Sequence, residues 1–373
     1  MSTASERVSV LMLSYNHAHL LDDAIASVAQ QTHDDFELLI GDDGSEDASR
    51  ALINAWADRD RRIQLVEFDR QGTVACLNAL AALARGSTLA LIGPADRFEP
   101  DHLARGVEHL AQRPERVATF SAVALCNDAG EADAALQSAL RLPRNRNVEG
   151  AALAQELVAY NCLHMPGAIV QKAAADALDP FVQAYGAHHD WDLWLRLSLR
   201  GSLHYSGETT VRSLVAKAAA AAATPSASAR FEALAIIESM APKVVAHYGL
   251  GEQTWGRLHG AMAEQALYSE QPRRALMHLA TKAKHDELAE HEKIWLMQTL
   301  ATTGRLVAAH DLAVLLHAER FSLRPETCEA LDVSSRALGW DLYDPGQVVT
   351  DAAPRGEATA RGAATSGRDA SAP

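Results

Sequence analysis

Three clusters of polar residues follow short apolar runs in the first hundred residues. They are SYN at residues 14–16, DDGS at residues 42–45 and GPADR at residues 93–97. The runs before them (VSVLML, FELLI and LALI) have the length and composition of buried strands. Because ligands of parallel sheets bind beyond the carboxyl ends of the strands, we expect the three clusters to form one binding edge.

Asp42 and Asp43 are the first candidates for ligand binding at this edge. A carboxylate at the end of a strand can accept the N–H of a uracil-like base. The alternative is that both aspartates, together with Ser45 and Asp47, cap the helix predicted from residue 48. Tyr15 could stack on or flank the base, or it could be an ordinary partly buried tyrosine.

Asp190 is the candidate for acid–base chemistry. It stands near the start of HDWDLWLRLSLRG, residues 189–201, whose pattern predicts a helix. A carboxylate at a helix start can lie within hydrogen-bond reach of a hydroxyl group and take its proton. The alternative is that Asp190 only caps the helix at residues 191–199.

The elements around these residues alternate between strands and helices. Strand patterns at residues 8–14, 36–40, 63–68 and 89–92 are separated by helical patterns at residues 20–31, 48–57 and 73–84. This alternation predicts an α/β domain at residues 1–215, with a mostly parallel sheet sandwiched by helices.

Composition excludes several classes of protein. The chain has 373 residues, with 34 Lys and Arg against 48 Asp and Glu and a net charge of −14. This balance argues against a general nucleic-acid binder, whose affinity comes mostly from basic residues on phosphates. No apolar run approaches the roughly 20 residues that span a bilayer, and the start lacks a secretory pattern. We therefore expect a protein of the cytoplasm, including its membrane surface, without a transmembrane segment.

The second half of the chain changes in character. Residues 216–229 form an Ala/Ser/Pro-rich linker pattern. Residues 230–345 lose the strand patterns and predict an all-α region resembling paired helical repeats, with helices at residues 231–248, 253–268, 272–284, 290–303, 306–318 and 326–338. Such helices could bind a protein partner, pack on the first domain or dimerise. Residues 346–373 are expected to be a disordered tail, because no large apolar side chain occurs from residue 351 onward.

The order of the motifs resembles the family 2 glycosyltransferases of the GT-A fold. The resemblance starts in the spacing of strand, SYN, helix, QT, strand and DDGS. It continues in GTVACLNALAALARG at residues 72–86, in ADRFEP at residues 95–100 and in the segment 189–201. It covers about residues 6–212. It implies a hexosyltransferase-like enzyme that moves a sugar from a nucleotide-sugar donor to a glycan or other hydroxyl acceptor, with inversion.

The resemblance also implies roles for individual residues. Asp43 would bind the nucleobase, and Asp190 would be the catalytic general base. The nucleotide-sugar would contact Ser14, Tyr15, Asp42, Asp43, Asn78, Asp96 and Arg97. The acceptor side would include His164, His189 and Trp191.

One motif departs from the family pattern. Where the family carries D-x-D-D, this chain reads Gly93-Pro94-Ala95-Asp96. A Mg²⁺ or Mn²⁺ ion prefers carboxylate oxygens as ligands, and Asp96 is the carboxylate that this motif retains. A histidine that many members carry near the end of the domain is also missing.

Three explanations of this departure are open. Asp96 could still help to hold a metal, fixed cations could replace it, or the domain could bind ligands without catalysis. The candidate cations are Arg97, Arg212, Lys217 and a protonated His188. We expect transfer with weak or no metal dependence. The alternative is a catalytically degenerate binding or scaffold protein that acts through its helical region.

Overall fold

The computed structural model describes residues 6–127, 129–139, 143, 147–215, 226–303 and 325–337, with residues 308, 309, 312, 313 and 316 of one further helical segment. Most of the predicted linker at residues 216–229, the whole predicted tail and most of the predicted helix at residues 306–318 lie outside these residues. The remaining predicted elements can be compared with the structure directly.

Four parallel strands form the first half of a nine-stranded sheet. They are β1 (Val8–Ser14), β2 (Phe36–Asp42), β3 (Ile63–Glu67) and β4 (Thr88–Ile92), and they lie in the order β3-β2-β1-β4. Each lies where the sequence predicts a strand. Their carboxyl ends therefore share one edge of the sheet, as expected.

The second half of the sheet is mixed. Its strands are β5 (Asp96–Phe98), β6 (Arg116–Cys126), β7 (Val148–Glu149), β8 (Ala168–Gln171) and β9 (Ser202–Leu214). β8 runs antiparallel to both β4 and β6, while β9 is parallel to β6 and antiparallel to β5 and β7. The predicted α/β fold with a mostly parallel sheet is thus confirmed, since β6 and β9 run in the same direction as β1–β4 and only β5, β7 and β8 run against them.

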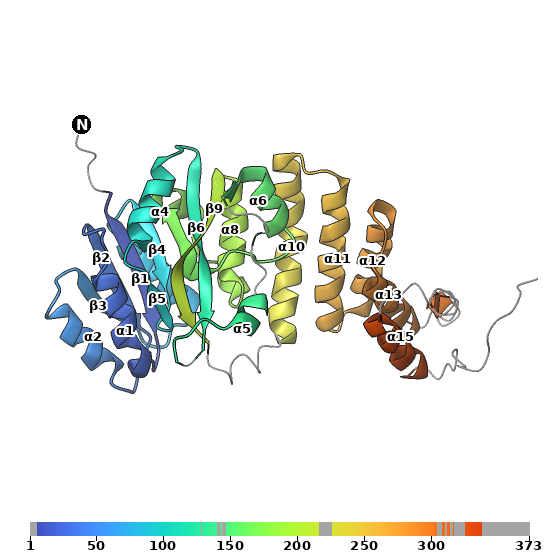
Figure 1. The fold of residues 1–373 in the computed structure, drawn as a ribbon, viewed down its shortest axis with the longest axis horizontal. Helices are drawn as coiled ribbons and strands as arrows, with labels where there is room; N and C mark the ends of the chain where they lie inside the picture. The colour runs from blue at the N-terminus through green and yellow to red at the C-terminus, as the bar shows by residue number, and fades with distance from the viewer. Residues whose placement is uncertain are drawn as a thin grey trace, which may run out of the picture.

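Helices cover both faces of the sheet (Figure 1). α1 (Ala18–Ala29), α2 (Ser49–Ala57) and α4 (His102–Ala111) pack into one core, and α3 (Thr73–Leu83), α6 (Gly150–Leu157) and α8 (His189–Ser198) pack into the other. Met12 of β1 points into the first core and Leu11 into the second, which is the two-residue period of a strand. The shorter elements are α5 (Ala134–Ala139), α7 (Lys172–Asp176), η1 (Met165–Gly167) and η2 (Gln183–Tyr185).

The C-terminal region is helical, as predicted. It contains α10 (Ala227–Tyr248), α11 (Glu252–Tyr268), α12 (Pro272–His285), α13 (Glu290–Thr302) and α15 (Pro325–Ala337). α10 begins four residues earlier than expected, because the Ser226 hydroxyl accepts a hydrogen bond from Ala229 N and caps the helix. None of the described helices combines the length and the apolar character that a bilayer-spanning segment requires.

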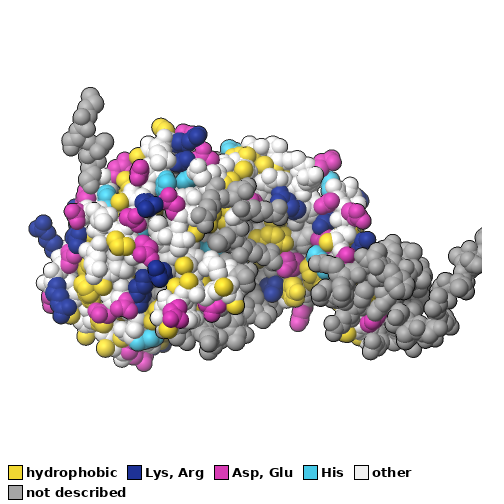
Figure 2. All heavy atoms as spheres, in the orientation of Figure 1, with side chains coloured by type: hydrophobic (Ala, Val, Ile, Leu, Met, Phe, Trp, Pro, Cys, Tyr) yellow, Lys and Arg dark blue, Asp and Glu magenta, His cyan; other side chains and the backbone are white. Residues whose placement is uncertain are grey.

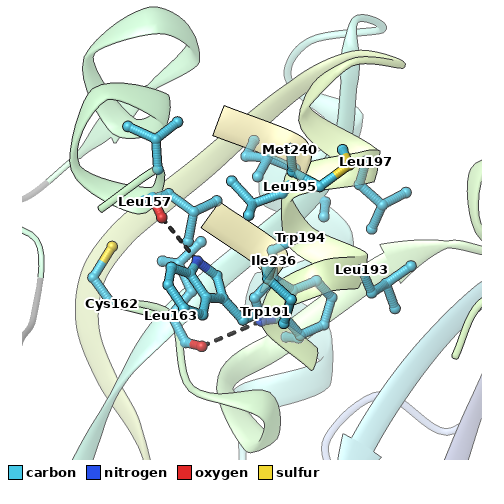
Figure 3. Packing of buried hydrophobic residues seen from close by; sticks show 14 of the residues in the cluster. Leu157, Cys162, Leu163, Trp191, Leu193, Trp194, Leu195, Leu197, Ile236 and Met240 are labelled. Atoms are coloured by element: carbon cyan, nitrogen blue, oxygen red, sulfur yellow. Dashed lines mark hydrogen bonds between the residues drawn. The ribbon is translucent and has the colours of Figure 1, made fainter. Parts of the chain in front are cut away.

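α10 shares a core with the sheet domain. Ile236 and Ile237 are fully buried in the same apolar cluster as Trp194 of α8, and Figure 3 shows Ile236 and Met240 beside the α8 side chains. At the end of α10, the Tyr248 hydroxyl donates to the carbonyl of Ser198 at 2.7 Å. α10 is therefore the outer layer that buries the back of α8.

A buried ion pair holds the next helices together. Lys282 Nζ of α12 lies 2.7 and 2.6 Å from the two carboxylate oxygens of Glu292 at the start of α13. Gly260 of α11 leaves the space for this pair, because a Cβ there would lie 2.7 Å from Glu292 Oε1. The C-terminal helices are thus joined by polar contacts as well as by apolar packing.

We predict that Ile237→Ala lowers the free energy of unfolding by about 3 kcal/mol, because it leaves a cavity in the core shared by α8 and α10. Urea unfolding measures this loss. Phe231→Ala is the matched control on the same helix, since that side chain is 49% exposed. Equal losses in the two variants would show that α10 does not share the core of the sheet domain.

Candidate functional site

The strand register brings the three polar clusters to one edge. Ser14 pairs with Asp42 across β1 and β2, and Asp43 N donates to the Ser14 carbonyl at 2.9 Å. Arg97 Nη2 donates to the Leu20 carbonyl of α1 at 3.1 Å, which ties the third cluster to the helix that follows the first. The three clusters therefore lie at one edge of the sheet, as expected, and their side chains differ in whether they face solvent or the protein interior.

Asp42 is turned into the protein. Its side chain is fully buried, and Oδ1 accepts hydrogen bonds from Ser45 N at 2.9 Å and from Arg50 Nε at 2.7 Å. Burial by itself would raise the pKa of Asp42, but the bonds from Arg50 and Ser45 outweigh it and hold the pKa below its ordinary value. This geometry does not support the predicted nucleotide contact of Asp42 and favours its role in holding the start of α2.

Asp43 stays at the edge. Its Oδ1 accepts from Gln71 N at 2.7 Å, and its Oδ2 accepts from Gly72 N at 2.9 Å. Gly72 is the N-cap residue of α3 and has a φ of 85°, a conformation that suits glycine. Asp43 therefore secures the start of α3 rather than that of α2. The Cys76 thiol also hydrogen-bonds to this carboxylate, which keeps acceptor capacity for one further donor.

Tyr15 and Arg70 form an exposed pair beside Asp43. The Tyr15 side chain is among the exposed large hydrophobic residues, and the Arg70 guanidinium carbon lies 5.2 Å from its ring centroid. Arg70 immediately precedes the Gln71-Gly72 segment that Asp43 holds. A flat ring, a cation and a carboxylate together suit a planar, anionic ligand. The sequence analysis missed Arg70, whose signal was its place two residues before the glycine that opens α3.

Ser14 and Asn16 serve the local turn. Ser14 is buried, and its hydroxyl oxygen has no hydrogen-bond partner in the structure. Asn16 has a φ of 56°, its N–H donates to Ser45 Oγ, and its Oδ1 accepts from Glu46 N at 2.8 Å. The backbone after β1 is thus fixed to the turn after β2, and the side chain of Ser14 does not face the open edge.

Asn78 connects two parts of the site instead of facing a donor. Its amide donates to the Phe181 carbonyl at 2.8 Å and accepts from Phe181 N at 3.0 Å, so both of its groups are used. The Phe181 ring then packs edge-on against His189 at 5.5 Å between centroids. From Gly72 to Asn78 the chain rises about 9 Å along α3. α3 therefore links the end held by Asp43 to the segment before Asp190.

Asp190 lies in the first turn of α8 and is partly buried. Its Oδ2 accepts a hydrogen bond from Asn161 Nδ2 at 3.0 Å, and its Oδ1 accepts from Trp191 N at 2.7 Å. Burial lowers the pKa of His164. The negative charge of Asp190 acts in the opposite direction and raises it, but by less. The Nε2 atom of His164 is buried without a partner. Asn161, which the sequence analysis did not single out, joins His164 and Asp190 in one cluster.

The segment before Asp190 is held by α10. Ala187 N donates to Glu232 Oε2 at 2.9 Å, and His188 Nε2 lies 2.9 Å from the carbonyl of Ala229, to which it must donate. His189 Nδ1 lies 2.9 Å from the Gly186 carbonyl. The bonds of His188 leave it poorly suited to the predicted role of a phosphate-binding cation.

Trp191 belongs to the core. Its side chain is 3% exposed, and its Nε1 donates to the Leu157 carbonyl at 2.8 Å, as Figure 3 shows. This corrects its predicted place on the acceptor side, because a buried indole offers no face to a sugar. His164 and His189 stay as acceptor-side predictions.

The residues around Asp96 do not fit a divalent metal ion. Asp96 is 7% exposed, and its Oδ2 accepts from Gly93 N at 2.7 Å. Burial raises its pKa, against hydrogen bonds from Ser213 and Gly93 that lower it. Within the described part of the chain, no group of three or more His, Cys, Asp or Glu could hold a metal. The structure therefore supports neither the predicted metal contact of Asp96 nor its contact with the donor.

The predicted replacement cations are already paired. Arg97 donates to the carbonyls of Pro94 and Asp96 and approaches Asp23 at 3.2 Å. Arg212, its cross-strand partner, lies 2.7 Å from Glu99. Lys217 lies outside the described residues. On the face in Figure 2, basic side chains are likewise interspersed with acidic ones over the sheet domain.

Comparison with known proteins places this arrangement in a family. Residues 9–168, from β1 to the start of β8, match the model of glycosyl transferase family 2. This part of the chain is therefore similar to the members of that family. The resemblance drawn from the motifs is thereby confirmed for the region that carries Tyr15, Asp43 and Asn161.

The curated relatives are longer than the region that matches. The protein CgeD of Bacillus subtilis is 35% identical over 136 residues, which is 34% of this chain and 32% of CgeD. The putative teichuronic acid biosynthesis glycosyltransferase TuaG of the same organism is 30% identical over 107 residues, which is 28% of this chain and 42% of TuaG. The matched region thus spans about a third of the length of the first relatives.

A solved structure resembles almost the whole chain. The TarS 1-349 structure from S. aureus, in complex with UDP-GlcNAc, matches with a TM-score of 0.55 and 14% identity over 90% of this chain and 92% of that one. This likeness confirms the GT-A glycosyltransferase fold with its helical C-terminal region.

We predict that Asp42→Asn lowers the free energy of unfolding at pH 7 by about 2 kcal/mol, because the buried bonds to Arg50 and Ser45 lose their charge. The folded-state pKa of Asp42 is lowered. Its stabilising effect is therefore full above the unfolded pKa of about 3.9 and disappears as pH falls through the folded value. Urea unfolding should show that the free energies of unfolding of wild type and Asp42→Asn differ at pH 7 and become more similar as the pH is lowered to 3.

Glu67→Gln is the control for this prediction. Glu67 also faces Arg50, at 3.6 Å, but its side chain is 59% exposed, so its loss should change stability little. If the difference in free energy of unfolding between wild type and Asp42→Asn stays constant down to pH 3, the ionised Asp42 does not stabilise the fold in the way described.

Proposed function

We propose that this chain is an inverting glycosyltransferase that moves a sugar from a nucleotide-sugar donor to a hydroxyl group of a glycan or other acceptor. The observation that carries the proposal is the state of Asp190. Its carboxylate lies in the first turn of α8, with one bond from Asn161 and one from Trp191 N. A carboxylate in that setting is oriented by a donor on each oxygen and keeps a lone pair that can accept a proton from a hydroxyl group, as a general base must.

The donor occupies the edge formed by Tyr15, Asp43 and Arg70. The exposed tyrosine ring offers a stacking face, and Asp43 keeps acceptor capacity for an N–H of the base. Arg70 is the cation at this edge that we assign to a phosphate group; its ion pair with Glu46 is exposed to solvent on both sides and can be exchanged for a phosphate. The binding of UDP-GlcNAc by TarS supports a nucleoside-diphosphate sugar as the class of donor.

In the proposed reaction, Asp190 takes the proton of the acceptor hydroxyl as its oxygen attacks the anomeric carbon. The new bond joins that oxygen to the sugar, while the bond from the anomeric carbon to the donor phosphate breaks. The electron pair leaves with the nucleoside diphosphate, and attack from the opposite side inverts the configuration. His164, with its unpartnered Nε2 beside Asp190, is the side chain we assign to a second acceptor group.

We further propose that transfer depends weakly or not at all on a metal ion. The side chains of Gly93 and Ala95 carry no oxygen ligand, and the Asp96 carboxylate accepts a hydrogen bond from Gly93 N. Charge on the leaving diphosphate would then be met by protein donors such as Arg70.

The first test is a donor screen. Calorimetry with UDP-, GDP- and TDP-sugars should identify a donor that binds, and transfer to added acceptors should follow. Asp190→Asn should keep donor binding and lower kcat by about 10²- to 10⁴-fold, the usual contribution of a general base. Asp176→Asn, which changes an exposed carboxylate bonded to Lys172, is the control and should keep full activity. Transfer that survives Asp190→Asn would sink the assignment of the base.

The second test removes metal ions. The enzyme should keep most of its rate after dialysis against EDTA, because no carboxylate pair stands at the usual position. Rates measured with EDTA and then with added Mn²⁺ give the comparison. A rate that vanishes with EDTA and returns with Mn²⁺ would show that a metal site assembles when the donor binds.

A further inference from the structure

Two indole groups fix the segment that faces Asp190. Trp191 Nε1 donates to the Leu157 carbonyl at 2.8 Å, and Trp194 Nε1 donates to the Leu163 carbonyl at 3.2 Å. Both tryptophans are buried, and Figure 3 shows the two bonds spanning from α8 to the neighbouring segment. Residues 157–163 are therefore held at both ends by the helix that carries Asp190.

Asn161 lies between these two anchors, and its amide has a defined orientation. Its Oδ1 accepts from Leu163 N at 3.4 Å, so its Nδ2 is the group that faces Asp190 Oδ2, at 3.0 Å. The opposite orientation would set the amide oxygen against a carboxylate oxygen and the amide N–H against another N–H. The segment therefore presents a hydrogen-bond donor to Asp190.

We propose that Asn161 is a positioning residue that fixes the orientation of the Asp190 carboxylate for proton transfer. The inference rests on the proposed function and adds to it a residue outside the known motifs. Trp191 N holds Oδ1 and Asn161 Nδ2 holds Oδ2, so the two donors hold both oxygens. The carboxylate then keeps one rotamer, and the free lone pair of each oxygen keeps one direction.

The Asp190 carboxylate is held rigidly because both of its hydrogen-bond donors are fixed to α8. One donor belongs to α8 itself, and the other lies on a segment bonded to α8 through the two indoles. Asp190 and its two donors therefore move as one body. A base held in this way need not be reoriented during the reaction, and a small misplacement would cost much of the rate.

The decisive variants are Asn161→Ala and Asn161→Asp, assayed with the donor found in the screen. Asn161→Ala removes the donor and should lower kcat/KM by about 10- to 100-fold. Asn161→Asp puts a second carboxylate about 3 Å from Asp190, where two carboxylates share a proton. The acid limb of the pH profile should then move up by about one pH unit or more.

The pH comparison holds the surroundings constant. The titratable groups on the elements around Asp190 include Asp192, Tyr160, Cys162, His164, His188, His189, Glu156, Glu232 and Glu264. All of them are unchanged between wild type and variant. Gln155→Ala is the matched control, because it removes a bond from Gln155 to Thr254 at 3.1 Å in the same region without touching Asp190. Its acid limb should not move.

The outcomes separate the two proposals. If Asp190→Asn abolishes transfer but Asn161→Asp leaves the acid limb in place, the positioning role is wrong and the proposed function stands. If transfer survives Asp190→Asn, or no donor is turned over by the wild type, the proposed function fails and the inference falls with it.

A second measurement does not need a substrate. Urea midpoints of Asn161→Ala, Asp190→Ala and the double variant form a cycle that reports the coupling between the two side chains. The effects of the two single variants should not add in the double variant. Additive effects would show that the bond between Asn161 and Asp190 is not made in solution, and this would overturn the inference whatever the activity.

Discussion

The burial of α8 on both of its sides is the constraint on which the rest of the structure depends. Trp191 and Trp194 face the sheet domain, and the apolar side chains of α10 cover the helix from behind. A helix packed in this way cannot rotate without opening a core, so the carboxylate at its start has a fixed place. α10 is in this sense part of the sheet domain, since without it the back of α8 would be exposed to water.

A second constraint runs through α3. Asp43 holds the backbone at the start of this helix, and Asn78, less than two turns further, holds Phe181. Phe181 in turn packs on His189, next to Asp190. The edge that holds Asp43 and the start of α8 that carries Asp190 are therefore linked through one helix, which is what the proposed reaction requires of two acidic residues far apart in sequence. The polar residues along this path act by holding backbone, not by facing the ligand.

The sequence was informative about elements and less so about individual side chains. The strands β1–β4 and the helices α10–α13 follow directly from apolar periodicity, which local sequence determines. Asp42 and Asp43 look alike in sequence, but the first is buried against Arg50 and the second reaches a distant loop. That difference depends on tertiary neighbours. Asn161 stands in a segment without regular pattern, and only the indole bonds from α8 reveal what it faces.

The turn after β4 shows why the missing aspartates cannot be read as simple deletions. A Cβ at Gly93 would lie 2.9 Å from Asp96 Oδ2, the atom that accepts from Gly93 N at 2.7 Å. A carboxylate at residue 93 would therefore push Asp96 out of its bond and turn two negative charges toward each other. Asp96 therefore closes this turn through its bond from Gly93 N. Restoring one aspartate would break that closure before it created a metal ligand set, so the departure from the family pattern is a property of the whole turn and not of one residue.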